Sequence, residues 1–294
     1  MRIAASTLAG LLVLVLTAGT PAAWGFDIHR YITNAAMDEV PAPIRPYFQK
    51  HRAFITEHSV DPDLMRTYGV ETEDPNHFLD MDAVAPDPFT GIPREEAEYI
   101  RKLGPEKARE YGRLPWRVEE VYTLLVTELK RPENWQRISS GTVNALTAIL
   151  AHYVEDGHVP FHAVVSYDGQ ATNQRGIHGR FESELFHRFR ARMTLAPVVP
   201  PPVTAPKDYM FGKLIEGTRL VPAVLAADKA AIEGREFYDD AYFEAFFGKA
   251  KPVVERRISE AIGSVAAVIA GAWQTAGKPV LPIDEMRTPS RIRR

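Results

Sequence analysis

Histidines and acids recur at metal-ligand spacing in the middle of this chain. His152 and Asp156 are four residues apart near the end of a segment with helical apolar spacing, and His178 and Glu182 repeat the same step. Side chains four residues apart leave a helix from the same face. His162 lies between the two pairs. Imidazole nitrogens and carboxylate oxygens are the ligands that Zn²⁺ accepts where cysteine is absent, so the pattern indicates a metal site.

The alternative is that each pair is an ion pair on a solvent-exposed helix face, which is the usual explanation for one such pair. Two pairs and a further histidine in one short stretch fit that explanation poorly. The first pair also continues an apolar stripe of Leu146, Ile149 and Leu150, so its side chains would point toward the interior. The pattern therefore favours a metal cluster.

An irregular stretch earlier in the chain, Thr56–Arg94, offers further ligands because it is rich in Asp, Pro and Gly. Ordered loops of this length are usually functional or held in place by something. Its candidate ligands are Asp63 and His77. Spacing does not rank them against the other acids of the stretch, which are Asp61, Asp80 and Asp82. The alternative is that Asp61 and Asp63 are turn residues around Pro62.

The elements expected to position these residues are helices, because apolar residues recur at helical spacing along most of the chain. The expected helices are Ile28–Glu39, Leu114–Lys130, Ser139–Glu155, Arg180–Met193, Met210–Ile232 and Pro252–Gln274. Prolines 41, 43 and 46 break the first, and the last begins with a proline in its first turn. No segment alternates like a strand over several residues. The sequence predicts an all-α fold with a single multi-helix domain.

Two further stretches are expected to be irregular. Ala163–Ile177 joins His162 to His178, and the proline-rich stretch Ala196–Pro206 is expected to be a stiff surface connector. The tail, residues 277–294, is basic and is expected to be disordered.

The composition excludes some classes of protein. Of 294 residues, 45% are apolar and 25% are charged, which excludes a mainly disordered or fibrous chain. The chain has no cysteine, so disulfides and thiolate metal sites are excluded. The formal net charge is −3, and basic residues cluster only in the tail. The balance gives no basic stripe of the kind that nucleic-acid binding normally requires.

The start of the chain has the features of a secretory signal peptide. Residues 1–23 hold one charge, Arg2, and an apolar run from Leu8 to Leu16, followed by Ala22-Ala23. The run is too short to span a bilayer. We therefore predict an exported protein without an integral membrane span.

Cleavage after residue 23 would give Trp24 a free α-amine. That amine could bind a metal together with the carbonyl oxygen of Trp24, and His29 follows five residues later. The alternative is that Trp24 is a core aromatic and His29 a surface histidine.

Together these segments resemble the superfamily of zinc-dependent phospholipases C and single-strand-specific nucleases, whose nuclease branch includes the fungal P-one enzymes. The resemblance runs from Trp24 to Glu182 and rests on five motifs in order, which are WGFDIH, PDLMR, NHFLD, HYVEDGHVPFH and HGRFE. It implies an all-α domain over residues 24–276 that binds three zinc ions in a cleft.

Carried over by position, the resemblance implies three sets of ligands. The first zinc would be held by Asp63, His77, His152 and Asp156. The second would be held by the amine and carbonyl of Trp24 and by His29, with Asp156 bridging the two ions. The third would be held by His162, His178 and Glu182.

The resemblance also implies a mechanism. Two metals roughly 3.5–4 Å apart can share a hydroxide and lower its pKa toward neutrality, which gives a nucleophile for in-line attack on phosphorus. The residues expected to carry the reaction are Asp63, Asp156 and Arg66. Arg66 matches an arginine of the nuclease branch and would hold the phosphate; the alternative is a solvent-exposed arginine.

Substrate contacts are expected where the second irregular stretch, Ala163–Ile177, runs beside the metals. Its candidates are Tyr167, Asn173 and Gln174. Phe78 and Phe161 flank ligands and could stack on a base or pack against an acyl glycerol, although such aromatics are more often part of the core.

Two features point to different branches of the superfamily. The five-residue step in WGFDIH is typical of the nucleases, whereas HGRFE ends in Glu and the loop from His162 to His178 is short, as in the phospholipases. We expect an exported, phospholipase C-like phosphodiester hydrolase that acts on a phospholipid. The alternatives are a single-strand-specific nuclease, acting on single-stranded nucleic acid or nucleotides, and a non-catalytic exported zinc-binding protein. No protein partner is predicted.

Overall fold

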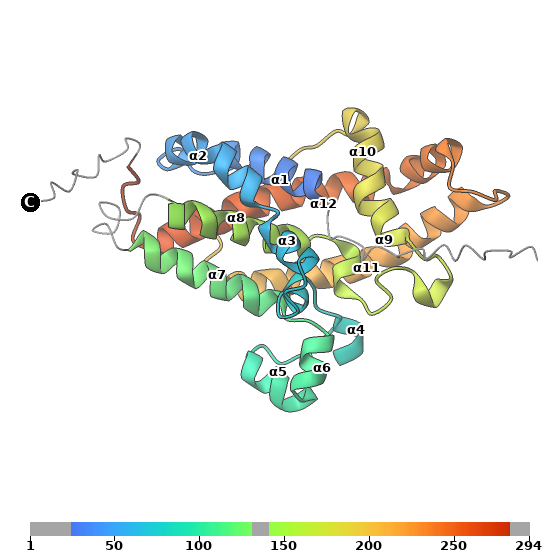
Figure 1. The fold of residues 1–294 in the computed structure, drawn as a ribbon, viewed down its shortest axis with the longest axis horizontal. Coiled ribbons are helices and arrows are strands. Elements are labelled where there is room, and N and C mark those ends of the chain that lie inside the picture. Colours follow the sequence, from blue (N-terminus) through green and yellow to red (C-terminus); the bar gives the residue numbers. More distant parts are fainter. Residues whose placement is uncertain (1–24, 131–140, 283–294) are drawn as a thin grey trace, which may run out of the picture.

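A computed structural model describes residues 25–130 and 141–282 of this chain (Figure 1). Its regular elements are helices, and no strand occurs in either of these ranges. An isolated bridge pairs Leu79 with Gly112. The prediction of an all-α protein is therefore confirmed. The expected signal peptide lies outside the described residues, as does most of the basic tail.

The long helices lie together in an elongated bundle (Figure 1). They are α1 (Phe26–Glu39), α2 (Arg45–His58), α7 (Leu114–Leu129), α8 (Gly141–Asp156), α11 (Pro206–Ile232) and α12 (Asp240–Thr275). α12 packs against α1, α7, α8 and α11, and so forms the centre of the bundle. Two shorter helices, α5 (Glu96–Leu103) and α6 (Pro105–Glu110), project from it.

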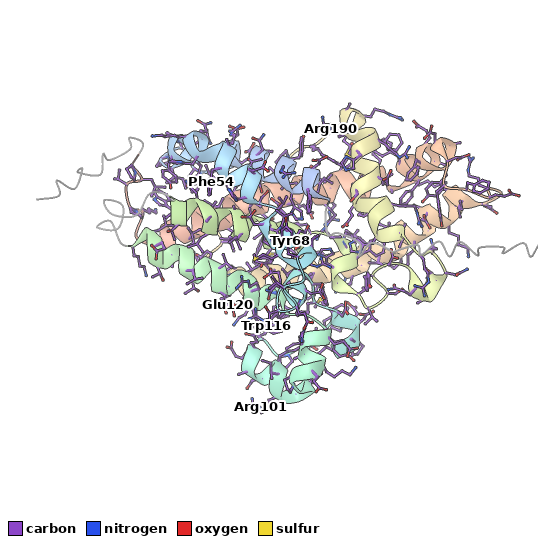
Figure 2. The ribbon with its side chains drawn as sticks, in the orientation of Figure 1. Phe54, Tyr68, Arg101, Trp116, Glu120 and Arg190 are labelled. Atoms are coloured by element: carbon purple, nitrogen blue, oxygen red, sulfur yellow. The ribbon has the colours of Figure 1, made fainter. Side chains whose placement is uncertain are left out.

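Short helical turns connect the long helices around the middle of the bundle. They are α3 (Asp61–Thr67), η1 (Asp74–His77), α4 (Met81–Val84), η3 (Pro160–Ala163), η4 (Gln170–Thr172), α9 (Ile177–Gly179), the π-helical turn η5 (Arg180–Glu184), α10 (Leu185–Phe189) and η6 (Arg190–Arg192). Figure 2 shows Tyr68 at the surface beside α3 and Arg101 at the far end of the α5–α6 projection.

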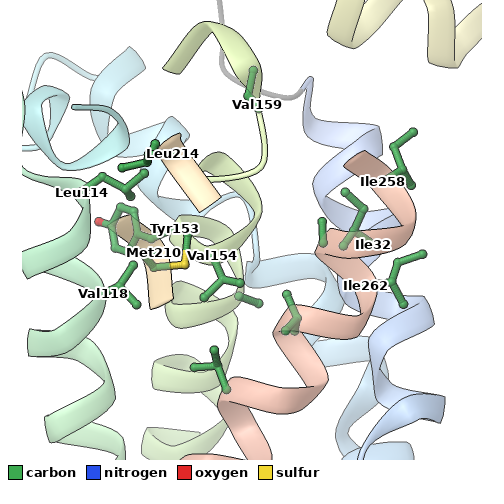
Figure 3. Close-up of a cluster of buried hydrophobic side chains, with 14 of the residues drawn as sticks. Ile32, Leu114, Val118, Tyr153, Val154, Val159, Met210, Leu214, Ile258 and Ile262 are labelled. Carbon is green, nitrogen blue, oxygen red and sulfur yellow. The ribbon is translucent and has the colours of Figure 1, made fainter. Parts of the chain in front are cut away.

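The core is continuous from α1 to α12. Side chains from α1, α7, α8, α11 and α12 pack together in it (Figure 3). Val118 of α7, Tyr153 of α8 and Met210 of α11 are each fully buried there. Burying one such large apolar side chain stabilises the fold by about 1.5–3 kcal/mol. These contacts hold the C-terminal end of α8, which carries His152 and Asp156, in a fixed position.

The proline-rich stretch 196–205 is not simply a surface connector. The backbone N–H of Val203 donates to the carbonyl oxygen of Ala267 on α12 at 3.0 Å, and Val203 is buried. A Cβ on Gly271 would overlap the carbonyl oxygen of Val203, so only glycine permits this close approach. Several residues of the stretch remain exposed, but it packs along α12.

The expected start of the last helix at Pro252 is wrong. α12 begins at Asp240, and the side chain of Asp239 caps it by accepting from the backbone N–H of Tyr242 at 2.7 Å. Pro252 lies inside the helix. The buried aromatics Phe243 and Phe246 anchor the turns before it, and their packing offsets the hydrogen bond that the proline lacks.

Two other boundaries also differ from expectation. α2 begins at Arg45 with Pro46 in its first turn, so this proline starts a helix instead of ending one. The stretch Thr56–Arg94 contains α3, η1 and α4 and is less irregular than expected. No helix within 25–130 or 141–282 is long and apolar enough to cross a membrane.

Candidate metal centre

Three groups of buried histidines and acids bring ligand atoms together in the middle of the bundle. The groups are His77, His152 and Asp156; His29, Asp63 and His152; and His162, His178 and Glu182. They come from α1, α3, η1, α8, η3, α9 and η5. Within each group the ligand atoms lie within 4.8 Å of one another, so each could hold a metal ion.

The first group has tetrahedral spacing once Asp63 is included. His77 Nδ1 lies 3.0 Å from Asp156 Oδ2, 3.1 Å from His152 Nε2 and 3.6 Å from Asp63 Oδ1. His152 Nε2 lies 3.2 Å from Asp156 Oδ2 and 3.9 Å from Asp63 Oδ1. Tetrahedral ligands held about 2.0–2.1 Å from zinc are about 3.3–3.4 Å apart. These four atoms therefore fit the ligand set that the resemblance implies for the first zinc.

His152 already faces the first group, so the second group is defined from here on as His29 with the opposite oxygens of the two carboxylates, Asp63 and Asp156. His29 Nε2 lies 3.6 Å from Asp156 Oδ1 and 3.9 Å from Asp63 Oδ2. None of these three buried atoms has a hydrogen-bond partner within the described chain. Asp63 thus faces both groups, as Asp156 does, whereas the resemblance gave the bridging role to Asp156 alone. Trp24, the other expected ligand here, lies outside the described residues.

The third group brings His162 close to the pair on α9 and η5. His178 Nε2 lies 2.9 Å from Glu182 Oε2, and the rings of His162 and His178 are 5.1 Å apart. Both nitrogens of His178 and both oxygens of Glu182 are buried without a hydrogen bond of good geometry. The i, i+4 spacing noticed in the sequence thus places both side chains at one point.

The unpaired atoms are the observation that tests whether metals fit. A buried polar atom without a partner costs about 1–3 kcal/mol, and a charged one costs more. Among the atoms that face the ligand groups, such atoms belong to five side chains, which are His29, Asp63, Asp156, His178 and Glu182. Each is a nitrogen or oxygen that a divalent cation accepts, and they converge within two neighbouring regions. The residues present therefore fit bound divalent metal ions.

Backbone carbonyls orient two of the histidines. His152 Nδ1 donates to the carbonyl oxygen of Ser59 at 2.8 Å, and His162 Nδ1 donates to that of His77 at 2.8 Å. Each bond leaves Nε2 free to act as the ligand atom. For His77 the roles are reversed, because Nδ1 faces the first group and Nε2 lies 3.5 Å from Glu73 Oε1. In each of these three histidines, one ring nitrogen faces a partner outside the ligand groups and the other is left as the ligand atom.

The electrostatics of the centre follow from its burial. Burial lowers the pKa of His29 well below its usual range, and the nearby His152 lowers it further. Burial opposes the charge of His77 as well, but hydrogen bonds with Asp156 and Glu73 raise the pKa of His77 to about 9. Burial raises the pKa of Glu182 to about 7. Carboxylates packed this closely without enough cations are the usual sign of a cation site.

A cavity of about 440 Å³ opens beside the ligands. His77, His162 and His178 face it, together with Arg66. Arg66 is about one-fifth exposed, and its guanidinium lies 3.0 Å from Asp74 and 3.7 Å from Asp63. It is thus held at the cavity wall next to the first group, as the phosphate-binding hypothesis requires.

Three of the expected substrate contacts also line this cavity, namely Phe78, Phe161 and Tyr167. Phe161 is fully buried and so is also part of the core, whereas Tyr167 is 41% exposed. Gly112 adopts a φ of +85° and packs directly against the backbone of Phe78, where a Cβ would overlap it. This close contact fixes Phe78 at the edge of the cavity.

Asn173 and Gln174 do not reach the cavity wall. Asn173 is exposed in a left-handed turn with a φ of 60°. Gln174 is buried on the other side of its loop, where its amide donates to Asp228 at 2.6 Å and to the carbonyl oxygen of Leu225 at 2.8 Å. Neither side chain is among those that line this cavity, and their contact with substrate stays a prediction.

The structure distinguishes Asp63 from the other candidate ligand acids of the stretch Thr56–Arg94. Asp61 is exposed to solvent and lies 2.8 Å from His58. Asp82 accepts from the backbone N–H of Val165 at 2.9 Å and so anchors the second irregular stretch. Asp80 lines the cavity, and no hydrogen bond or ion pair joins its carboxylate to another described residue. Asp63 alone among these acids belongs to a ligand group.

Sequence reasoning missed two features of the site. Glu155 and Glu73 are buried carboxylates behind His29 and His77. Asp80 and Glu110 give the cavity an acidic wall, and burial together with Asp82 and Glu110 raises the pKa of Asp80 to about 7. The acid next to Asp156 was visible in the sequence, but helical spacing alone did not show that it was buried.

No protein-family model matches this chain, and no curated protein matches it significantly. The assignment to the phospholipase C and nuclease superfamily therefore stays a prediction. The function proposed below rests on the residues of the site.

Proposed function

We propose that this chain is an exported zinc-dependent phosphodiester hydrolase of the phospholipase C type. The observation that carries the proposal is the arrangement of Asp63 and Asp156. Each directs one carboxylate oxygen toward His77 and His152 and the other toward His29. Two carboxylates shared in this way, beside a cavity with an arginine, are what a two-metal phosphoesterase needs.

Zinc ions held by these residues would supply Lewis acidity and a hydroxide nucleophile at neutral pH. The chain's own residues would do the rest. Arg66 would bind the non-bridging oxygens of the phosphate, since its guanidinium faces the cavity beside Asp63. Asp63 and Asp156 would hold the ligand atoms of the two groups at fixed positions relative to one another. Burial of the ligands excludes bulk water, which strengthens each electrostatic contact.

The cavity favours a phospholipid over nucleic acid as the substrate. Asp74, Asp80 and Glu110 contribute carboxylates to its wall, and among the described residues that line it Arg66 is the only Lys or Arg. The described wall offers the further phosphates of a polynucleotide no Lys or Arg beyond Arg66, whereas nucleic-acid grooves are basic. A single phosphodiester whose remaining groups are apolar or cationic suits aromatic side chains next to carboxylates.

The test is made on the full chain, exported and processed by its host so that its natural N-terminus forms. Metal content is measured by elemental analysis, and hydrolysis is measured on phosphatidylcholine vesicles and on single-stranded DNA. We expect about three zinc ions per chain and phosphate-ester cleavage of the lipid.

The other outcomes separate the alternatives. Faster cleavage of single-stranded DNA would support the nuclease instead. Bound zinc with neither activity would support the non-catalytic zinc-binding protein. A chain that binds no zinc would refute all three.

A further inference from the structure

Glu155 and Asp156 are consecutive acids at the end of α8, and both side chains are fully buried. Successive side chains on a helix diverge by about 100°, so the two carboxylates leave α8 in different directions. Asp156 faces the ligand groups. Glu155 reaches α1 instead, where its Oε2 lies 2.5 Å from His29 Nδ1 and its Oε1 accepts from the Thr33 hydroxyl at 2.6 Å.

This contact determines which nitrogen of His29 is the ligand atom. When Glu155 is ionised, its carboxylate can only accept a hydrogen bond, so Nδ1 carries the proton and Nε2 is left with its lone pair. Nε2 is the atom that faces Asp63 and Asp156 without a hydrogen-bond partner. The His29 ring also stacks on the His152 ring, with 4.0 Å between centroids, which restricts its tilt.

The acceptor behind His29 differs from those behind two other candidate ligands. His152 and His162 donate to backbone carbonyls, which are neutral. His29 instead contacts a side-chain carboxyl group, 2.5 Å away, which a substitution can alter without changing the backbone. A fully buried carboxylate has a large desolvation cost. Thr33 satisfies one of its oxygens and His29 the other, so the pair is built as a unit.

We propose that Glu155 is a positioning residue that acts through His29 and determines how firmly the second group retains its metal. The proposal rests on the metal binding proposed above. Partners of this kind typically change metal affinity by about 10–100-fold when they are removed. The third group, His162, His178 and Glu182, does not include His29 and provides an internal reference.

The experiment compares wild type with Glu155→Gln, both full-length, by competition for Zn²⁺ against a chromogenic chelator. The amide keeps the size of the side chain but replaces one carboxyl oxygen by an NH₂ group, which donates and does not accept. We expect one of the bound zinc ions to dissociate about 10–100-fold more readily, while the zinc of the third group is retained. Thr33→Val, which leaves the carboxylate but frees one of its oxygens, is expected to weaken the same ion by a smaller factor.

Glu260→Gln is the matched control, because Glu260 is a partly buried, ion-paired glutamate that belongs to none of the ligand groups. It should leave all zinc affinities unchanged. Circular dichroism and melting temperature are recorded for every variant, so that a folding defect is recognised by loss of all ions together.

Three outcomes decide the question. Selective loss of one ion in Glu155→Gln supports the proposal. Affinities equal to those of wild type for every ion would overturn it, and so would an equal loss from the third group, which would mean a structural role only. If wild type itself binds no zinc, the proposed function fails as well, which distinguishes that failure from this one.

Discussion

Asp63 and Asp156 approach the same cluster of histidines from two different helices, and each divides its oxygens between two ligand groups. Asp63 Oδ1 lies 3.6 Å from His77 Nδ1, and its Oδ2 lies 3.9 Å from His29 Nε2. Asp156 Oδ2 lies 3.0 Å from His77 Nδ1, and its Oδ1 lies 3.6 Å from His29 Nε2. The pairing makes both carboxylates part of both sites.

Asp156→Asn should therefore affect two metals at once. Loss of the shared charge should release the zinc of the first and second groups and lower kcat/KM about 1,000-fold or more, because a metal pair contributes several kcal/mol to transition-state stabilisation. Elemental analysis and lipid hydrolysis measure both effects. Asp61→Asn, in the exposed acid paired with His58, is the control and should change neither. An unchanged rate for Asp156→Asn would refute the shared site.

Removing the metals should lower the stability of the fold. The ligand groups join α1, α3, η1 and α8, so bound ions stabilise only the folded chain. One site with ligand at 1,000 times its Kd contributes about 4 kcal/mol, which corresponds to about 10 °C in Tm for a chain of this size. Calorimetry with and without a chelator measures the shift. The shift should be smaller in Asp156→Asn, and an apo protein with an unchanged Tm would contradict the prediction.

Arg66→Ala should weaken substrate binding without removing metal. A charge-assisted hydrogen bond contributes about 1.5–3 kcal/mol, so kcat/KM is expected to fall about 10–100-fold. The kcat/KM of Arg66→Lys should lie between those of wild type and Arg66→Ala, because lysine keeps the charge but not the planar fork of donors. Arg109→Ala is the control, since Arg109 is an exposed arginine that pairs with Glu71. A loss of zinc in Arg66→Ala would mean that the residue supports the ligands instead.

Asp80→Asn should stabilise the protein, and the gain in free energy of unfolding should grow as the pH rises. In the folded chain the pKa of Asp80 is raised to about 7 by burial, Asp82 and Glu110, above its value of 3.8 in an unfolded chain. A raised carboxyl pKa means that wild type is most stable below the unfolded value and loses stability as the pH rises toward 7. The gain from Asn, measured by urea unfolding, should therefore be larger at pH 8 than at pH 5, by about 1–3 kcal/mol.

The control for that prediction is Asp87→Asn, in an exposed acid paired with Arg219. It should show no comparable rise between the two pH values. A gain from Asp80→Asn that is the same at pH 5 and pH 8 would show that the carboxyl titrates normally.

His158 should make the fold less stable in acid. Burial, together with Arg257, lowers the pKa of His158 well below 6.5, and its ring bonds the carbonyl of Val154 at 2.7 Å and Ser264 at 3.0 Å. The unfolded chain then binds a proton below pH 6.5 that the folded chain does not, so stability falls as the pH drops below 6.5. The slope from this residue is at most about 1.4 kcal/mol per pH unit.

Urea unfolding between pH 7.5 and pH 5.5 measures that slope. His158→Gln should be less stable than wild type at pH 7.5, but its free energy of unfolding should depend less on pH, by the uptake of one proton. Equal slopes in the two proteins would show that His158 is protonated in the folded state.

The sequence predicted the helical architecture because long amphipathic segments are strongly periodic. α7 and α8 lie close to their expected ranges. Proline was the weak point, since Pro46 and Pro252 occupy a helix start and a helix interior, opposite to the expectation for each. Which outcome occurs depends on packing partners distant in the sequence, and local pattern does not contain them.

The ligand candidates were predictable for a similar reason. His152 and Asp156, like His178 and Glu182, share a helix turn, so spacing alone brings each pair together. Joining His29 and Asp63 to them required the family resemblance, because those contacts join residues about 90 to 130 positions apart. Glu155 was beyond both kinds of reasoning, since its role depends on the position of α1 beside α8.

Every candidate ligand in the described chain lies at or before Glu182, whereas α11 and α12 follow it. These two helices contribute none of the grouped ligands, yet α11 packs on η3 and α12 packs on α1 and α8. A chain truncated after Glu182 would keep the whole grouped set and lose the surfaces that hold it together. The ligand residues alone therefore do not make the site, because α11 and α12 supply the packing that holds the ligand-bearing elements together.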